Sequence, residues 1–139
     1  MKSRETLIRL KKFQVEERRW RVSQIEGMIA DFQRMSADLE REILSEQERA
    51  GINDPSHFAY PTYAKAAIQR RENLMRSAEE LCSQLDDAKA LLAEAFEELK
   101  RVELLDERDQ ARERAEETAR EQADLDGIGL MRARLGVIA

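Results

Sequence analysis

Residues that interrupt helices are scarce in this sequence, and they are unevenly placed. Only two of the 139 residues are proline and five are glycine, and both prolines, Pro55 and Pro61, lie in one short stretch. Residues 62–126 contain neither type, and residues 3–50 contain only Gly27. Because glycine and proline punctuate helices, the sequence predicts a helix over about residues 3–50, a turn at 51–61 and a second helix over about residues 62–126.

Cysteine and histidine are scarce as well, and their scarcity excludes several classes of protein. The single cysteine, Cys82, cannot build an intramolecular disulfide framework, and together with the single histidine, His57, it offers no metal-ligand spacing. No apolar run approaches the roughly 18 residues that span a bilayer, and the start of the chain is too charged for a signal peptide. We therefore expect a soluble, cytoplasmic protein without a metal or other cofactor.

Charged residues, in contrast, make up 38% of the chain, against 5% aromatic residues. This composition is too polar to surround a wide core, but it suits an elongated coiled coil. Helices of roughly 45 and 60 residues would be about 70 and 90 Å long, and they would enclose almost no volume for a substrate pocket. The many carboxylates are then solvated on helix faces and do not converge on a cavity. The sequence thus argues against an enzyme and against a small-molecule substrate.

Apolar residues recur in both helical segments at alternating steps of three and four, which is the spacing of a coiled-coil seam. In the first segment the seam contains Ile8, Val15, Val22, Ile25, Ile29, Phe32, Ser36, Leu39 and Ile43. In the second segment it contains Leu74, Leu81, Leu85, Ala88, Leu92, Ala95, Leu99 and Val102. Beyond Val102 the large residues give way to alanines spaced four apart, so we expect thin packing there.

The short connection between the two segments predicts how they pair. Gly51 suits the left-handed position that ends a helix, and Asp54 with Pro55 suits the cap and first position of a new one. A loop this short returns the chain alongside itself. The predicted fold is therefore all-α, a long antiparallel two-helix coiled-coil hairpin that forms a single rod over residues 1–139. This pairing places Ser36 opposite Ala78.

Charges at the two ends of the chain support the same pairing. Residues 2–21 are strongly basic and residues 106–126 strongly acidic, and each block lies at the unfavourable end of its own helix dipole. An antiparallel hairpin brings the two blocks together. The alternative, a basic segment that binds nucleic acid, lacks an aromatic and basic groove and conflicts with the net charge of -5. We therefore expect no nucleic-acid partner.

Several residues are not required by the hairpin, and they are the candidate partner-binding residues. Leu10, Phe13 and Trp20 lie outside the seam, with Phe13 and Trp20 seven residues apart and so on one face. This stripe either docks into another protein or is incidental surface covered by arginine stems. A second set lies at the turn and contains Phe58, Tyr60 and Tyr63. Its members either cap the open end of the coiled coil or bind a partner.

Three smaller expectations concern single residues and the end of the chain. His57 is interpreted as a loop residue that hydrogen-bonds locally, and Cys82 as a partly buried small hydrophobe. If the turn is centred near Pro55, Ser3 reaches only to about residue 110, which leaves residues 111–126 beyond the first helix. Glycines at 127 and 129 are then expected to end the second helix and to leave a flexible tail at 127–139.

With these features the chain resembles the flagellar type III export protein FliJ family, and the resemblance covers nearly its whole length. It rests on the hairpin length, on the aromatic residues that start the second helix, on the long charged end over residues 106–126, and on the opening Leu7-Ile8-Arg9-Leu10. The stretch over residues 1–13 is similar in particular to the alphaproteobacterial branch.

The resemblance implies a non-enzymatic stalk, similar in shape to the central stalk of rotary ATPases. In that family the joined ends of the helices insert into the hexameric export ATPase, another part contacts the export-gate membrane protein, and export chaperones are further partners. The implied location is the cytoplasm, at the inner face of the membrane beneath the flagellum. Two other classes stay open: a generic scaffold or oligomeric coiled coil, and, ranked last, a transcription regulator that inserts a coiled-coil tip.

Overall fold

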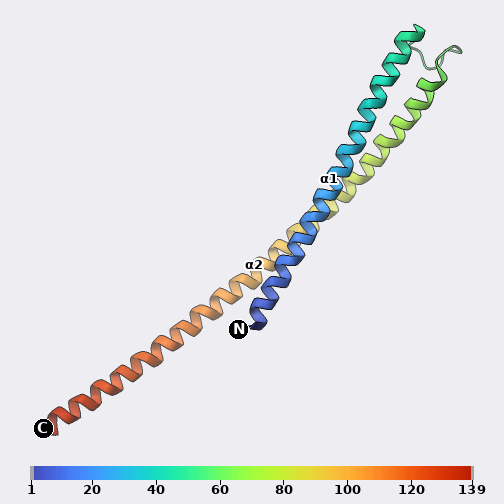
Figure 1. Ribbon diagram of the computed structural model, residues 1–139. Helices are drawn as coiled ribbons and strands as arrows, with labels where there is room; N and C mark the ends of the chain where they lie inside the picture. The colour runs from blue at the N-terminus through green and yellow to red at the C-terminus, as the bar shows by residue number, and fades with distance from the viewer. Residues whose placement is uncertain (1, 139) are drawn as a thin grey trace. The chain divides into compact units, whose positions relative to one another are not determined.

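The computed structural model describes residues 2–138 and contains two α-helices, α1 (Lys2–Ala50) and α2 (Thr62–Ile138). One connection, residues 51–61, joins them, and no strand occurs within residues 2–138 (Figure 1). The two helices pack against each other along their seams. The predicted all-α fold of two long helices is confirmed, and the start and end of α1 lie close to the predicted positions.

The chain divides into two compact units, each built from a part of both helices. We call Phe13–Phe96 the hairpin unit, because it contains the turn. The residues before Phe13 and those after Phe96 form the second unit, which we call the terminal unit. The expectation of a single rod over the whole chain stays a prediction.

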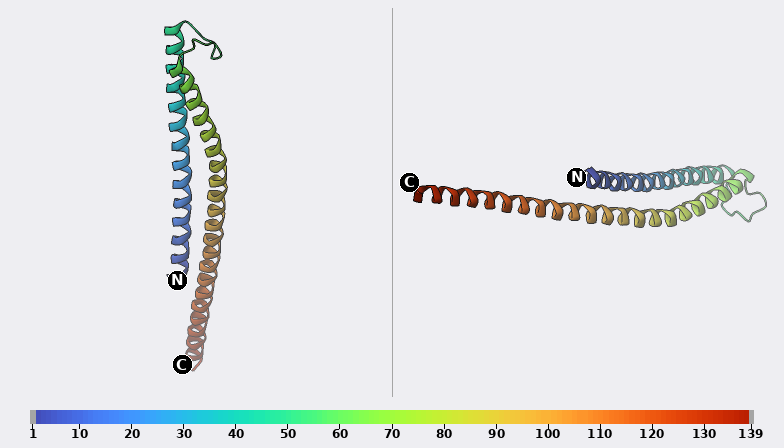
Figure 2. Two further views of the ribbon diagram at one scale, coloured as in Figure 1. Left: turned by 90° about the vertical axis from the view of Figure 1, so that its right-hand side faces the viewer. Right: turned by 90° about the horizontal axis from the view of Figure 1, so that it is seen from below.

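In the hairpin unit most core residues occupy predicted seam positions, and near the turn Ala64 and Ala67 extend the core beyond the predicted seam. One cluster contains Val22, Ile25, Ile29, Leu81 and Ala88, with Phe32, Leu85 and Leu92 packed against it. A second cluster, nearer the turn, contains Leu39, Ile43 and Ala67, with Ile68 and Leu74 against it. Figure 2 shows the two helical segments of this unit running alongside each other in opposite directions. The predicted seam and antiparallel pairing are thus confirmed here.

The turn joins the helices at the expected residues, since α1 ends at Ala50 and α2 starts at Thr62. Gly51 has a φ of 69° and its amide donates to the Gln47 carbonyl at 2.8 Å, so it occupies the left-handed position that favours glycine. Asp54 and Pro55, however, do not begin a helix: the Asp54 carboxylate accepts bonds from the Ser56 amide and hydroxyl and closes a local turn. The first backbone bond of α2 runs from Lys65 to the Pro61 carbonyl.

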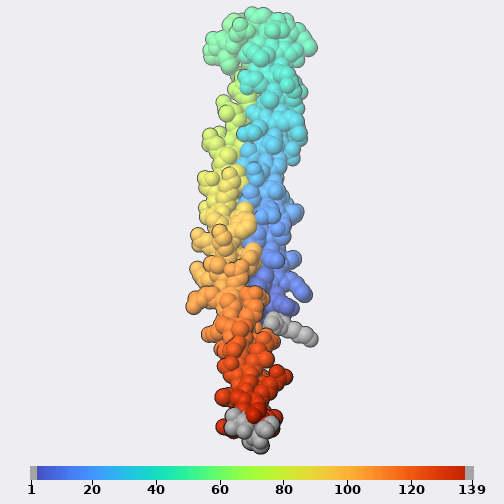
Figure 3. All heavy atoms as spheres, turned by 90° about the vertical axis from the view of Figure 1, so that its left-hand side faces the viewer, coloured from blue at the N-terminus to red at the C-terminus, as the bar shows by residue number. Residues whose placement is uncertain are grey.

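In the terminal unit the seam continues with much less burial. Ile8, Leu99 and Val102 are only half-buried, and no side chain within residues 3–12 or 97–136 is fully buried. Instead, charges of opposite sign meet: Arg4 contacts Asp106, Asp109 and Glu113. The expected pairing of the basic and acidic ends is confirmed. Figure 3 shows the start of α1 against the part of α2 that follows Phe96.

The far end of α2 corrects the expected helix boundary. We expected the helix to end near Asp126, but it continues to Ile138. Gly127 and Gly129 do not adopt positive φ, so neither ends the helix, and the residues that follow include the good helix formers Leu130, Met131 and Ala133. All side chains from Gln110 to Gly136 are exposed, as the thin packing predicted for this segment requires.

Candidate docking surfaces

The first candidate surface is a groove on the hairpin unit beside Phe13 and Trp20, which we call the aromatic groove. These two side chains are 60% and 65% exposed, respectively, so packing within the unit does not use them. The floor of the groove is formed by seam residues of both helices, Ile25 and Ala88, with Leu91 beside them. The helical spacing of Phe13 and Trp20 therefore predicted correctly that both lie outside the seam.

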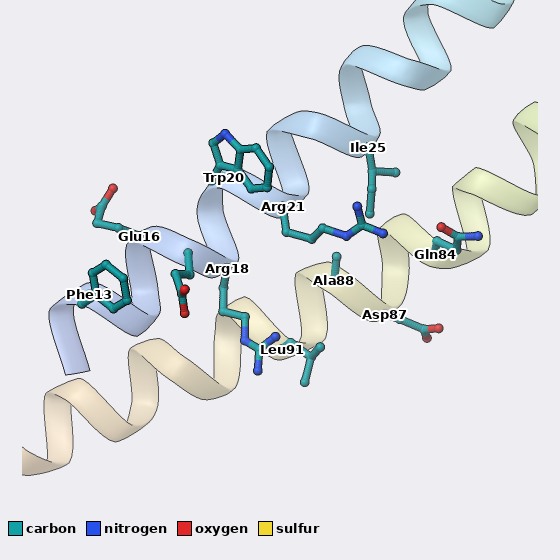
Figure 4. Close-up of a pocket in the computed structure, with 11 residues that line it drawn as sticks. Phe13, Glu16, Arg18, Trp20, Arg21, Ile25, Gln84, Asp87, Ala88 and Leu91 are labelled. Atoms are coloured by element: carbon teal, nitrogen blue, oxygen red, sulfur yellow. The ribbon is translucent and has the colours of Figure 1, made fainter. Parts of the chain in front are cut away.

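Charged side chains of both signs border the aromatic groove. Figure 4 shows Arg18 and Arg21 extending from α1 toward α2, whereas Trp20 points away from α2. Glu16 and Asp87 add negative charge to the same surface. Tryptophan and arginine are the residue types that most often anchor protein interfaces. An apolar floor with exposed aromatics and a charged rim has the anatomy of an interface core with its polar border.

Leu10 was predicted with this stripe but belongs to the terminal unit. Its side chain is half-exposed there and is not part of the core of either cluster. Its docking role stays a prediction. Phe96, in contrast, is an apolar residue of the hairpin unit that is partly covered, because the Arg19 guanidinium lies over its ring at 5.4 Å from the centroid.

The turn residues separate into two roles. Tyr60 is only 6% exposed, and its hydroxyl accepts a bond of 2.8 Å from the Gln47 side-chain amide. It therefore closes the end of the hairpin unit, as the capping alternative required, and it offers almost no surface to a partner. Phe58 is 97% exposed and stacks only on His57, with ring centroids 4.7 Å apart.

The exposure of Tyr63 is intermediate between that of Tyr60 and that of Phe58. Its ring is exposed, and its hydroxyl donates a bond of 2.8 Å to the Glu42 carboxylate on α1. This hydrogen bond and the negative charge of Glu42 raise the pKa of Tyr63. His57, as expected, bonds locally: its Nδ1 accepts a bond from the Ala59 amide. Phe58 is thus the turn residue with the most accessible apolar surface.

A second groove on the hairpin unit was not recognised from the sequence. Small residues, Ser36 and Ala78, leave space between the helices, and Phe32, Leu74 and Met75 border that space. The opposition of Ser36 and Ala78 was predicted, but the groove that it leaves was not. Cys82 also lines this groove and is exposed, which corrects its expected partial burial. The predicted opposition of Ser36 and Ala78 was the available signal, because two small side chains that face each other cannot fill a coiled-coil layer.

The described part of the chain has neither a cluster of possible metal ligands nor a helix that could span a membrane. Within the described residues, no group of three or more His, Cys, Asp or Glu side chains is arranged to hold a metal ion. No helix between residues 2 and 138 has an apolar stretch long enough to cross a membrane. These surfaces consist of exposed aromatic and apolar side chains with charged residues beside them.

Two long helices that share an apolar seam and present exposed aromatics define this chain as a two-helix coiled-coil protein. The family model of the Flagellar FliJ protein matches residues 1–136. The chain therefore belongs to the FliJ family and is a component of flagellar export, in a family that is not known as an enzyme. Comparison with curated proteins and with solved structures gives no match.

Proposed function

We propose that this protein is a non-enzymatic stalk of the flagellar export apparatus that engages the hexameric export ATPase through its aromatic groove. The family match supports a place in flagellar export. The observation that carries the choice of surface is the exposure of Phe13 and Trp20 beside an apolar floor. Large exposed aromatics that the fold does not need are the side chains that most often supply binding energy.

The other surfaces suit the other partners of the apparatus. The groove bordered by Phe32, Leu74 and Met75 is apolar and lies in the middle of the hairpin unit, where it suits a contact with the export-gate membrane protein or with export chaperones. Phe58 at the turn is a second candidate for the ATPase ring. Because no described helix spans a membrane, attachment through these partners would hold the protein in the cytoplasm, at the inner face of the membrane.

The test is binding of the full chain to the purified export ATPase hexamer, with Phe13→Ser and Trp20→Ser combined. Loss of both interface anchors should weaken binding by at least about thirtyfold, since even one anchor of this kind contributes about 2 kcal/mol or more. Helicity and the melting temperature should not change, because neither side chain belongs to the core. Flagellar assembly should fall in parallel with binding.

A matched control uses two exposed apolar residues of the same unit that lie outside both grooves. Leu44 and Met28 meet this condition, so Leu44→Ser combined with Met28→Ser should leave binding unchanged. Phe58→Ser, measured separately, decides whether the turn also contacts the ring. Full ATPase binding and normal motility in the Phe13 and Trp20 double variant would reject the aromatic groove as the docking surface.

A further inference from the structure

In the terminal unit, charged residues occupy seam positions of both helices, next to the half-buried Ile8, Leu99 and Val102. On α1, Arg4, Lys11, Arg18 and Ile25 follow one another at steps of seven. On α2, the alternating steps of three and four continue from Val102 through Asp106, Asp109 and Glu113. Arg4 therefore faces the acidic seam positions Asp106, Asp109 and Glu113 of α2. This pattern is readable in the sequence once the register of the two helices is known.

Arg4 is the centre of this charged seam. Its Nε lies 3.4 Å from Asp106 Oδ1, its Nη1 3.3 Å from Asp109 Oδ2 and its Nη2 2.8 Å from Glu113 Oε1. The side chain is only 19% exposed. Nε and Nη1 are buried and have no partner with hydrogen-bond geometry, so the nearby carboxylates alone balance their charge. A second ion pair, 2.9 Å between Lys11 Nζ and Glu98 Oε2, lies two turns further along α1.

The apolar contribution to this contact is small. Ile8, Leu99 and Val102 are half-buried, whereas every core residue of the two clusters lies within the hairpin unit. Burial of apolar surface scales with the area removed from water, so apolar packing holds residues 2–12 weakly. Ionic contacts must therefore supply much of the closing free energy.

We propose that residues 2–12 form an ionic latch on residues 97–113, which opens and closes while the hairpin unit stays folded. In the closed state Arg4 offsets the mutual repulsion of three carboxylates that lie within about two turns of one another on α2. In the open state residues 2–12 lose their only packing surface, and a helix end of this length frays in water. The latch thus governs access to Leu99, Val102 and the acidic seam of α2 without any change in the aromatic groove.

Varying the ionic strength distinguishes closure by ion pairs from closure by apolar packing. The screening length falls from about 10 Å at 0.1 M salt to about 3 Å at 1 M, and this weakens ionic contacts but not apolar ones. Spin labels at Glu5→Cys and Arg108→Cys, in the full chain with Cys82→Ser, report the latch distance. The short distance should dominate at low salt, and it should be lost progressively as NaCl is added. A second pair, Arg34→Cys and Glu80→Cys, reports the hairpin unit and should not respond.

Substitutions of Arg4 test whether this residue closes the latch. Arg4→Gln should open the latch already at low salt. Arg34→Gln is the matched control, because it removes an ion pair that Arg34 makes with Asp31 of the same helix, and it should leave the latch distance unchanged. Arg4→Glu should open the latch further, and adding Asp106→Arg with Asp109→Arg should restore the short distance through pairs of reversed sign.

Three results would overturn the latch. The first is a latch distance that ignores both NaCl and Arg4→Gln, which would mean that apolar packing closes the terminal unit. The second is opening of the hairpin pair in parallel with the latch pair, which would mean that the two units are not independent. The third is opening by Arg34→Gln, which would mean that overall surface charge matters and Arg4 does not. ATPase binding by the Phe13 and Trp20 double variant is a separate measurement, so failure of either proposal leaves the other testable.

Discussion

The hairpin unit and the terminal unit use the same two helices and the same seam spacing, yet they are held together by different forces. The hairpin unit buries aliphatic residues from both helices, among them Ile25 at 1% exposure. The terminal unit has half-buried aliphatics and an arginine surrounded by three carboxylates. The spacing of seam positions therefore decides which faces meet. The residue types at those positions decide how stable the contact between the two faces is.

The difference has a functional consequence. Apolar burial keeps its strength when salt changes, whereas contacts between charges are screened. The aromatic groove lies on the unit with the apolar core, so we expect its geometry to be unchanged at salt concentrations that would open the proposed latch. This division would suit the proposed docking through the aromatic groove together with the proposed opening of residues 2–12.

The largest expected effect on stability comes from comparing the same change, isoleucine to alanine, at one seam position in each unit. Ile25→Ala should lower the free energy of unfolding by about 2–5 kcal/mol, because it leaves a cavity in a filled core. Ile8→Ala removes the same atoms from a half-buried site and should cost about 1 kcal/mol or less, since only part of the transfer free energy is lost. Urea denaturation followed by circular dichroism measures both values. Equal losses would mean that the two units are equally packed.

Replacing a helical glycine by alanine in each unit should have a smaller stabilising effect. In the hairpin unit the effect should extend to the whole fold, and in the terminal unit it should stay local. Gly27 and Gly127 are both helical, and a Cβ at either would meet open space. Alanine at either position should favour the helix by up to about 1 kcal/mol. Gly27→Ala should raise the melting temperature, because Gly27 lies in the unit with the core.

Gly127→Ala should instead slow amide exchange around residue 127 and leave the melting temperature unchanged. Gly51→Ala is the control of opposite sign, because Gly51 has a φ of 69° that alanine adopts only with strain. A rise in melting temperature with Gly127→Ala would show that the far end of α2 unfolds together with the core.

The smallest effect concerns the pH response of the terminal unit. The hydrogen bond and positive charge of Lys11 lower the pKa of Glu98 below its ordinary value of 4.5. The ionised form is thus favoured in the folded state, so the contribution of this pair is fully present above pH 4.5 and is lost as the pH falls through the lowered pKa.

Amide exchange of residues 2–12, measured between neutral pH and mildly acidic pH, checks this response. Wild type is compared with Glu98→Gln, which leaves the carboxylates around Arg4 in place, so the difference isolates the Lys11 pair. Because this pair is exposed, the difference should be small. An identical pH profile for the two proteins would show that the pair does not contribute to closure.

The sequence determined most of the fold. The absence of glycine and proline over residues 62–126, together with the three-and-four spacing, determined two long helices and their seam, because these properties act locally along each helix. Gly51 determined where α1 ends, since few other residues adopt its backbone conformation. The exposure of Phe13 and Trp20 also followed from helical spacing alone.

Only the tertiary structure decided the features that depend on which residues face each other across the two helices. It placed Arg4 against three carboxylates, left a groove where Ser36 meets Ala78, and buried Tyr60 under a hydrogen bond from Gln47. It also showed that Gly127 and Gly129 continue α2, because a helical glycine needs no cap when its neighbours favour the helix. The spacing of seam residues along one helix can be read from the sequence. The register between two helices depends on packing at all layers of the seam together.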